Sequence, residues 1–207
     1  MNNASYNNFL NFIQNDIVDH GGTCIFQYTR TVTYPGDGVE VNGYYDNSTK
    51  TLSVGMKQNK EKILPLIAHE YCHFLQWKEN SKYSIEHDNK SIFFWNWMDG
   101  CDELPSDWID DACKACLNLE LDCERRTIDI ITKHGLPIDV AKYAKQAESY
   151  IYFYLYMRIH RKWYETDREP YNLESVYSEF SGDLSGDFLH ISKKIEDLYT
   201  LHCFQGV

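Results

Sequence analysis

The strongest constraint in this sequence is a group of three polar side chains inside an apolar helical pattern. After residue 60 the chain carries apolar residues at helical spacing, and His69, Glu70 and His73 interrupt them. At about 100° per residue the two histidines leave the same flank of a helix one turn apart, and Glu70 lies between them toward the buried side. Burying such groups is costly unless a partner such as a metal ion satisfies them.

The spacing H-E-x-x-H gives these three residues a specific chemistry. Imidazoles four positions apart on one helix can chelate a single zinc ion, and the intervening glutamate can act on a water held by that ion. The sequence therefore predicts Zn²⁺ as the cofactor, with His69 and His73 as ligands and Glu70 as the catalytic residue. The opposing interpretation is a degenerate motif that binds no metal.

The order of periodic segments predicts an α+β fold. An amphipathic helix is expected at 4–19, and β-branched and aromatic runs predict three strands, the last two joined as a hairpin. Trp-rich and Gly-containing segments are expected to be irregular connections. The expected strands lie at 23–34, 39–46 and 50–56, and helices are expected after 60 and at 107–134, 138–165 and 187–203.

The length of 207 residues favours one domain. It spans residues 1–207, with the sheet and the active helix within about 1–80 and a helical subdomain within about 105–207.

Charge and composition exclude several classes of partner. The net charge of −11 argues against nucleic-acid binding, which depends on clustered Lys and Arg. The first residues lack the pattern of a signal peptide, and no segment reaches the roughly 20 apolar residues that span a bilayer. We therefore expect no membrane partner and a cytoplasmic location.

Cysteine usage agrees with that location. Seven cysteines, an odd number without an export signal, indicate reduced thiols rather than a disulfide framework. Cys113 and Cys116 form a C-x-x-C that could build an all-thiolate zinc site with Cys101 and Cys123. This alternative is disfavoured because the segment reads as continuous helix.

The segment from Gly43 to His73, which ends in HEYCH, resembles the zincin metallopeptidases, in particular small cytoplasmic and phage-encoded ones. The resemblance implies a minimal zincin-like fold, with a small mostly antiparallel sheet, the active-site helix and a helical C-terminal half. It also implies that the strand at 50–57 is the sheet edge that binds an extended substrate. Gln76 and Glu79 stand where the metzincin pattern requires Gly and His, which excludes that subclass.

The activity implied by this resemblance is zinc-dependent hydrolysis of peptide bonds, with Glu70 as general base. The substrate would be a protein or a peptide, among them a host or regulatory protein. A donor for the oxyanion could come from Tyr150, Tyr154 or His160, and the sequence does not choose among them.

The third zinc ligand is expected on the helix at 107–134. On a helical wheel Glu120 and Glu124 fall on or beside its apolar face, so they need a cation, a basic partner such as Arg125, or protons. The resemblance to gluzincins implies Glu120 as ligand and Glu124 as the group that orients a ligand histidine. The reverse assignment stays open, and the rival ligands are His87, Asp102 and Asp111.

Two other functions stay open. The chain could be a catalytically idle zincin that acts as a binding or inhibitory module with a structural metal. The Trp-rich helical half could also be the interacting part. A closed fourth coordination position would distinguish a structural from a catalytic ion.

Overall fold

The computed structural model describes residues 3–36, 38–101 and 103–204, which form two compact units. The first unit comprises the described residues up to 81 together with 126–138, and the second comprises those from 82 to 125 and from 139 onward. The structure confirms the α+β class: helices predominate, and the strands all belong to the first unit. Helix α4, Ser106–Lys133, contributes residues to both units.

A three-stranded sheet organises the first unit. Its strands are β1 (Thr23–Gln27), β4 (Gly43–Asp46) and β5 (Thr51–Gly55), in the order β1-β5-β4. The expected hairpin is present, because β4 pairs with β5 in antiparallel fashion. Strand β1 pairs with β5 in parallel, so this sheet is mixed, whereas the β4–β5 and β2–β3 pairings are antiparallel.

The predicted substrate-binding edge at 50–57 is wrong. Strand β5 lies between β1 and β4 and has no open edge. Its residues Leu52, Ser53, Val54 and Gly55 are all buried, as a strand covered on both faces requires. The segment TLSVG carries no signal of this burial, because it alternates polar and apolar residues as a half-exposed strand does.

The two longer expected strands are each interrupted. The first divides into β1 and β2 (Val32–Thr33), and the second into β3 (Glu40–Val41) and β4, with β2 and β3 paired separately. The break between β1 and β2 lies where the backbone of Arg30 crosses Gly55 of β5. A Cβ at Gly55 would lie 2.5 Å from the Arg30 carbonyl oxygen, so only glycine permits this approach.

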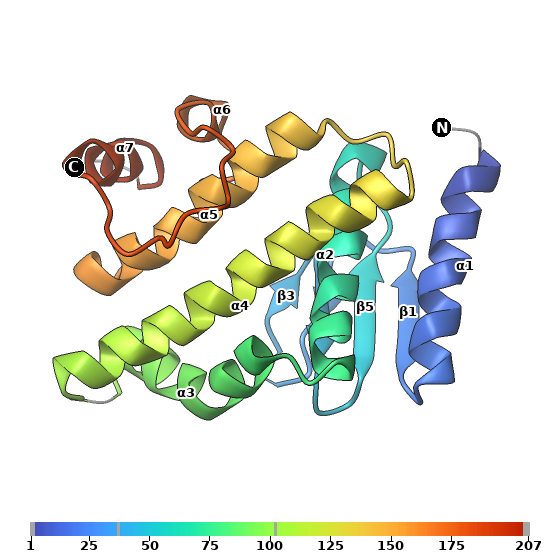
Figure 1. The fold of residues 1–207 in the computed structure, drawn as a ribbon, viewed down its shortest axis with the longest axis horizontal. Coiled ribbons are helices and arrows are strands. Elements are labelled where there is room, and N and C mark those ends of the chain that lie inside the picture. Colours follow the sequence, from blue (N-terminus) through green and yellow to red (C-terminus); the bar gives the residue numbers. More distant parts are fainter. Residues whose placement is uncertain (1–2, 37, 102, 205–207) are drawn as a thin grey trace. The chain divides into compact units, whose positions relative to one another are not determined.

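Two helices pack on this sheet (Figure 1). Helix α1, Asn3–Asp19, lies beside β1, and helix α2, Lys60–Lys78, packs on β4 and β5. The Asn59 side chain caps α2 by accepting the backbone N–H of Glu61. The core of the unit therefore includes the apolar face of α2 that carries the H-E-x-x-H motif.

A part-buried polar contact joins α1 to α2. Asp16 accepts a hydrogen bond from the Tyr71 hydroxyl at 2.7 Å and forms an ion pair with Lys78 at 2.7 Å. Burial alone would raise the pKa of Asp16, but the hydrogen bonds from Lys78 and Tyr71 outweigh it and hold that pKa below its ordinary value. The contact involves Tyr71, the residue directly after Glu70, so it anchors the motif.

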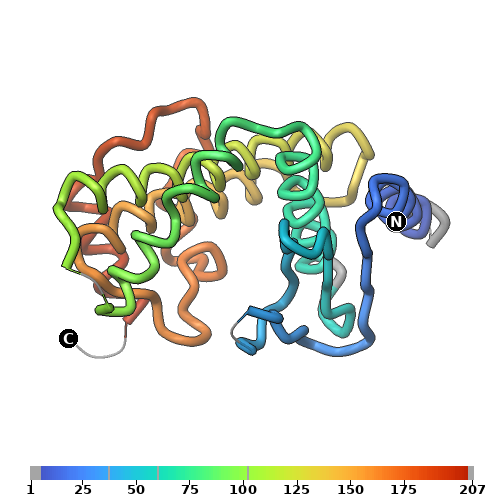
Figure 2. The backbone as a smooth tube through the Cα atoms, turned by 90° about the horizontal axis from the view of Figure 1, so that it is seen from below, coloured from blue at the N-terminus to red at the C-terminus, as the bar shows by residue number. Residues whose placement is uncertain are grey.

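The second unit is helical. Helices α4 and α5 run antiparallel and side by side, as Figures 1 and 2 show. Cys113 donates to the carbonyl oxygen of Tyr154, and Arg158 pairs with Asp110 at 2.6 Å. The helices besides α4 are α3 (Lys82–Met98), α5 (Val140–His160), α6 (Glu174–Tyr177) and α7 (Lys193–His202).

Three expectations for this half are corrected. The Trp-rich segment expected to be irregular forms α3, because 82–98 contains neither Gly nor Pro and buries Phe94 completely. Helix α5 ends before the expected position, since Arg161 adopts a left-handed conformation with φ of 50°. The last predicted helix begins later, where Ser192 caps α7, and α6 was missed.

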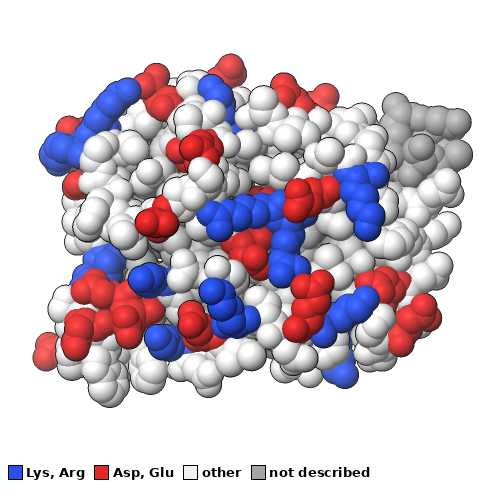
Figure 3. Space-filling view, in the orientation of Figure 1, with Lys and Arg blue, Asp and Glu red and all other residues white. Residues whose placement is uncertain are grey.

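Charged side chains are interspersed on the surface. In Figure 3 acidic and basic residues are interspersed over the face drawn. This distribution accompanies a net charge of −11.

Among the described residues, no helix combines the length and apolar character needed to cross a bilayer.

Replacing Asp16 with Asn should destabilise the fold in a pH-dependent way. Losing the charged partner of Lys78 and Tyr71 should cost about 1.5 to 3 kcal/mol of unfolding free energy at pH 7. Because the pKa of Asp16 lies below 3.8 in the folded chain, its contribution is complete above that pH and is lost as the pH falls through the folded-state pKa.

Urea unfolding of the metal-free protein should therefore show a wild-type advantage at pH 7 that narrows below about pH 4. Asp19→Asn, at an exposed position of the same helix, is the matched control and should unfold like the wild type. A gap that stays constant with pH would contradict the assigned role of the Asp16 charge.

Candidate metal centre

The two histidines of the motif converge in the first unit. The Nε2 atoms of His69 and His73 lie 3.1 Å apart, and both side chains are half-buried. Two nitrogens bound to one zinc at about 2.0 to 2.1 Å with tetrahedral geometry would be separated by about 3.3 Å. The spacing of the imidazoles thus fits a shared zinc ion.

Gln76 holds the far side of one imidazole. Nδ1 of His73 lies 2.9 Å from Oε1 of Gln76, whose side chain is only 1% exposed. A carbonyl oxygen accepts hydrogen bonds, so this contact places the His73 proton on Nδ1 and leaves the lone pair of Nε2 facing His69. That tautomer is the one that a metal ligand at Nε2 requires.

Glu70 occupies the inner side of the same helix. It is 8% exposed and lies between the fully buried Ile67 and Phe74, in agreement with the helical wheel. Glu70 is buried on the same helix as the paired imidazoles. This placement suits a carboxylate that transfers protons and is not simply hydrated by bulk water.

A second polar face lies on α4. Glu120, Cys123, Glu124 and Thr127 follow one another at helical spacing, and Cys123, Glu124 and Thr127 are 5% exposed or less. The side chain of Arg125, weighed as a partner for the glutamates, bonds elsewhere: it donates to the carbonyl oxygens of Leu184 and Gly186. The face therefore carries two carboxylates and a thiol, all of them metal-ligand types.

Tyrosines of α5 surround the two carboxylates within the second unit. The Tyr143 hydroxyl donates to Oε2 of Glu124 at 2.5 Å. Burial raises the pKa of Tyr150 and Tyr154 well above the ordinary value, and the charge of Glu120 raises both further. Glu124 is thus held by a phenol, and Glu120 lies close enough to act electrostatically on two more.

The three residues considered for the oxyanion differ in their contacts. His160 lies at the end of α5 and pairs with Glu196 of α7 at 3.1 Å. The hydroxyls of Tyr150 and Tyr154 lie 3.2 Å apart in the neighbourhood of Glu120. Which of the three residues would donate to an oxyanion stays a prediction.

The rival ligands have other partners. His87 faces Asp88 on α3 at 3.7 Å, and Asp111 lies 3.6 Å from Lys90 with 70% of its side chain exposed. Asp102 lies outside the described residues.

The cysteines that the structure describes are all free thiols, as expected. Cys113 donates to the carbonyl oxygen of Tyr154, and burial raises its pKa to about 12. A zinc-bound cysteine is a thiolate, so this environment disfavours the all-thiolate alternative. Cys101 is exposed, whereas Cys116 and Cys123 are buried in α4.

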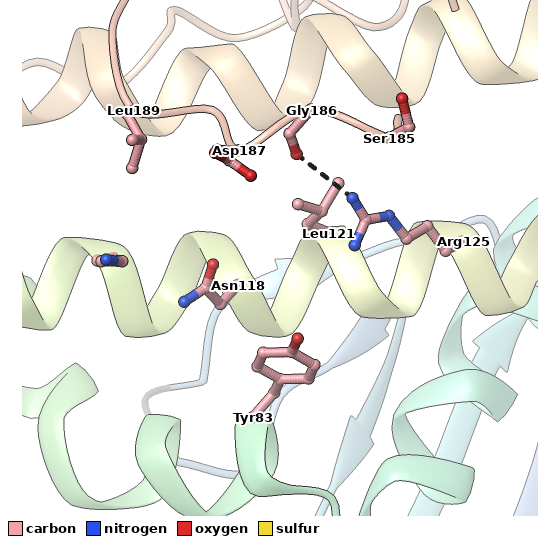
Figure 4. A pocket seen from close by; sticks show the side chains of 9 residues that line it. Tyr83, Asn118, Leu121, Arg125, Ser185, Gly186, Asp187 and Leu189 are labelled. Atoms are coloured by element: carbon pink, nitrogen blue, oxygen red, sulfur yellow. Dashed lines mark hydrogen bonds between the residues drawn. The ribbon is translucent and has the colours of Figure 1, made fainter. Parts of the chain in front are cut away.

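A shallow polar hollow of about 370 Å³ lies elsewhere in the second unit (Figure 4). It opens between α3, α4 and the loop that follows α6, and Arg125 reaches across it to the Gly186 carbonyl. Residues of the H-E-x-x-H motif do not line it. Its lining consists of Tyr83, Lys114, Asn118, Leu121, Arg125, Ser185, Gly186, Asp187 and Leu189.

The structure thus brings together His69, Glu70 and His73 on one helix of the first unit. Glu120 and Glu124 belong to the second unit, and their part in the centre stays a prediction. The sequence interpretation missed Gln76 as a histidine partner, although its position three residues after His73 places both on one face. It named Cys123 only as a member of the all-thiolate alternative, although Cys123 shares a face of α4 with both glutamates.

No protein family, curated protein or solved structure matches this chain.

The purified protein should contain about one equivalent of zinc. His69→Ala and His73→Ala should each lose most of it and lower the unfolding temperature, because a metal bound only by the folded state stabilises that state. Elemental analysis of protein purified without chelators gives the stoichiometry. His190→Ala, at an exposed position of the second unit, is the control and should keep its zinc. Full zinc content in both motif variants would refute the histidine assignment.

Proposed function

We propose that this chain is a zinc-dependent peptidase that hydrolyses peptide bonds in a protein or peptide substrate. One observation carries the proposal: two imidazole nitrogens lie 3.1 Å apart on a helix that also buries a glutamate between them. A pair of histidines alone would suit a structural ion. The adjacent Glu70 adds a proton acceptor, which hydrolysis requires.

The chemistry divides between the ion and the chain. A zinc ion held by His69 and His73 would supply a Lewis acid that lowers the pKa of water and polarises a carbonyl. Glu70 would take the proton from the attacking water and return it to the leaving amine. The side chain of Glu70 is 8% exposed, so bulk water has little access to the carboxylate.

For the third ligand we propose Glu120 of α4. The contacts of Glu124 support this choice, because the Tyr143 hydroxyl already engages its Oε2. Two histidines and a glutamate form a ligand set typical of catalytic zinc, with one position left for water. Cys123 and Glu124 share the buried face and are the alternatives.

The sheet suggests how a substrate would bind. Since β5 is central, an extended peptide would pair with β4, the edge strand on which α2 also packs. The substrate class includes host or regulatory proteins. Free cysteines support a reducing, cytoplasmic location, and the interspersed charges support a protein rather than a nucleic-acid partner.

The buried face of α4 also favours a second function. If Glu120 and Cys123 both joined the two histidines, the coordination sphere would be closed and the ion structural. The chain would then be an idle zincin-like binding or inhibitory module. A hydroxamate inhibitor distinguishes the two, because it needs an exchangeable position: displacement of water by the inhibitor supports the peptidase, and no binding supports the module.

Glu70→Gln should keep zinc and fold but lose peptidase activity by about 10²- to 10⁴-fold, because an amide cannot accept the proton of water. The assay is cleavage of a mixed peptide library, with zinc content measured on the same samples. Glu61→Gln, at an exposed position in the first turn of α2, is the matched control. Activity within about tenfold of the wild type would remove Glu70 from the role of general base.

The third ligand can be assigned from zinc affinities of Glu120→Ala, Cys123→Ser and Glu124→Ala. A residue that only orients a ligand should cost about 10- to 100-fold in affinity, and loss of a ligand should cost more. We expect the largest loss in Glu120→Ala, measured by competition with a chromophoric chelator. A near-wild-type affinity in that variant, with a large loss in one of the others, would reassign the ligand.

A further inference from the structure

We propose that Gln76 is a positioning residue for the metal: its side-chain carbonyl fixes the tautomer and the ring orientation of His73. The inference rests on the proposed zinc-binding role of His69 and His73. The inference adds Gln76 as the group that fixes the proton position and orientation of His73 in the metal-free protein.

The geometry on the far side of the ring defines the proton position. Oε1 of Gln76 lies 2.9 Å from Nδ1 of His73, and the glutamine side chain is 1% exposed, so bulk water does not compete for this contact. The oxygen can only accept, which requires a proton on Nδ1. A neutral imidazole has one N–H, so Nε2 carries a lone pair.

The near side of the ring agrees with this assignment. Nε2 of His73 lies 3.1 Å from Nε2 of His69. Without an ion, the Nε2–H of His69 can donate to the lone pair on Nε2 of His73, which pairs the two facing nitrogens. With an ion, both nitrogens would turn lone pairs to it, and His73 would need no change of tautomer or rotamer.

A residue of similar size that lacks a hydrogen-bond acceptor would no longer hold the proton of His73 on Nδ1. In Gln76→Leu the proton of His73 could occupy either nitrogen, so part of the metal-free population would turn an N–H toward the metal position. Partners of this kind typically contribute 10- to 100-fold to metal affinity. We therefore expect Gln76→Leu to bind zinc about 10- to 100-fold more weakly than the wild type.

The experiment compares Gln76→Leu and Gln76→Glu with the wild type. The glutamate variant keeps a carboxylate acceptor and should bind zinc at least as tightly as the wild type. Gln146→Leu is the matched control: Gln146 donates to the Tyr171 carbonyl oxygen at 2.8 Å in the second unit, so it loses an amide hydrogen bond away from the motif. Zinc affinity is measured by chelator competition, and ¹⁵N NMR of metal-free protein reports the tautomer of His73.

Support consists of a dominant Nδ1–H form of His73 in the wild type, a mixture in Gln76→Leu, and weaker zinc binding in that variant alone. The proposal is overturned by a dominant Nε2–H form in the wild type, or by unchanged affinity in folded Gln76→Leu. If Gln76→Leu fails to fold, the tautomer of His73 in the wild type and the zinc affinity of Gln76→Glu decide whether the proposal holds. A wild type that takes up no zinc overturns the proposed function, and the tautomer then tests Gln76 independently because it needs no metal.

Discussion

The burial of polar groups on the core-facing side of α2 is the constraint on which the rest of the first unit depends. A carboxylate at Glu70 that is 8% exposed costs free energy unless its surroundings compensate it. The fold holds the helix in place by packing it on β4 and β5 and by tying Tyr71 and Lys78 to Asp16 of α1. The packing and hydrogen bonds of the rest of the unit therefore offset the free-energy cost of burying the Glu70 carboxylate.

The same side of α2 gives the paired imidazoles their defined geometry. Helical spacing alone brings residues 69 and 73 within reach of each other, but flexible rings could still turn apart. The contact between His73 and the buried Gln76 limits that freedom. The part of the proposed centre that lies on α2 thus follows from the register of this helix and from four side chains, those of His69, Glu70, His73 and Gln76.

The sequence predicted those parts of the site that depend on local periodicity. The positions of His69, Glu70 and His73 on α2, and the hairpin of β4 and β5, follow from spacing and turn residues. The central place of β5 could not be read locally, because it depends on the parallel pairing with the distant β1. Helix α3 was missed because its aromatic residues suggested irregular structure, although packing of Phe94 stabilises a helix there. The hydrogen bond from Tyr143 to Glu124 joins residues on different helices, so no spacing in the sequence indicates it.

X-ray absorption spectroscopy of zinc-loaded protein tests the central claim most directly, since it reports the atoms around the ion without reference to activity. The account predicts two imidazole nitrogens and further oxygen donors, all at about 2.0 to 2.1 Å. A shell that lacks two imidazoles, or one dominated by sulfur at about 2.3 Å, would contradict a centre built on His69 and His73.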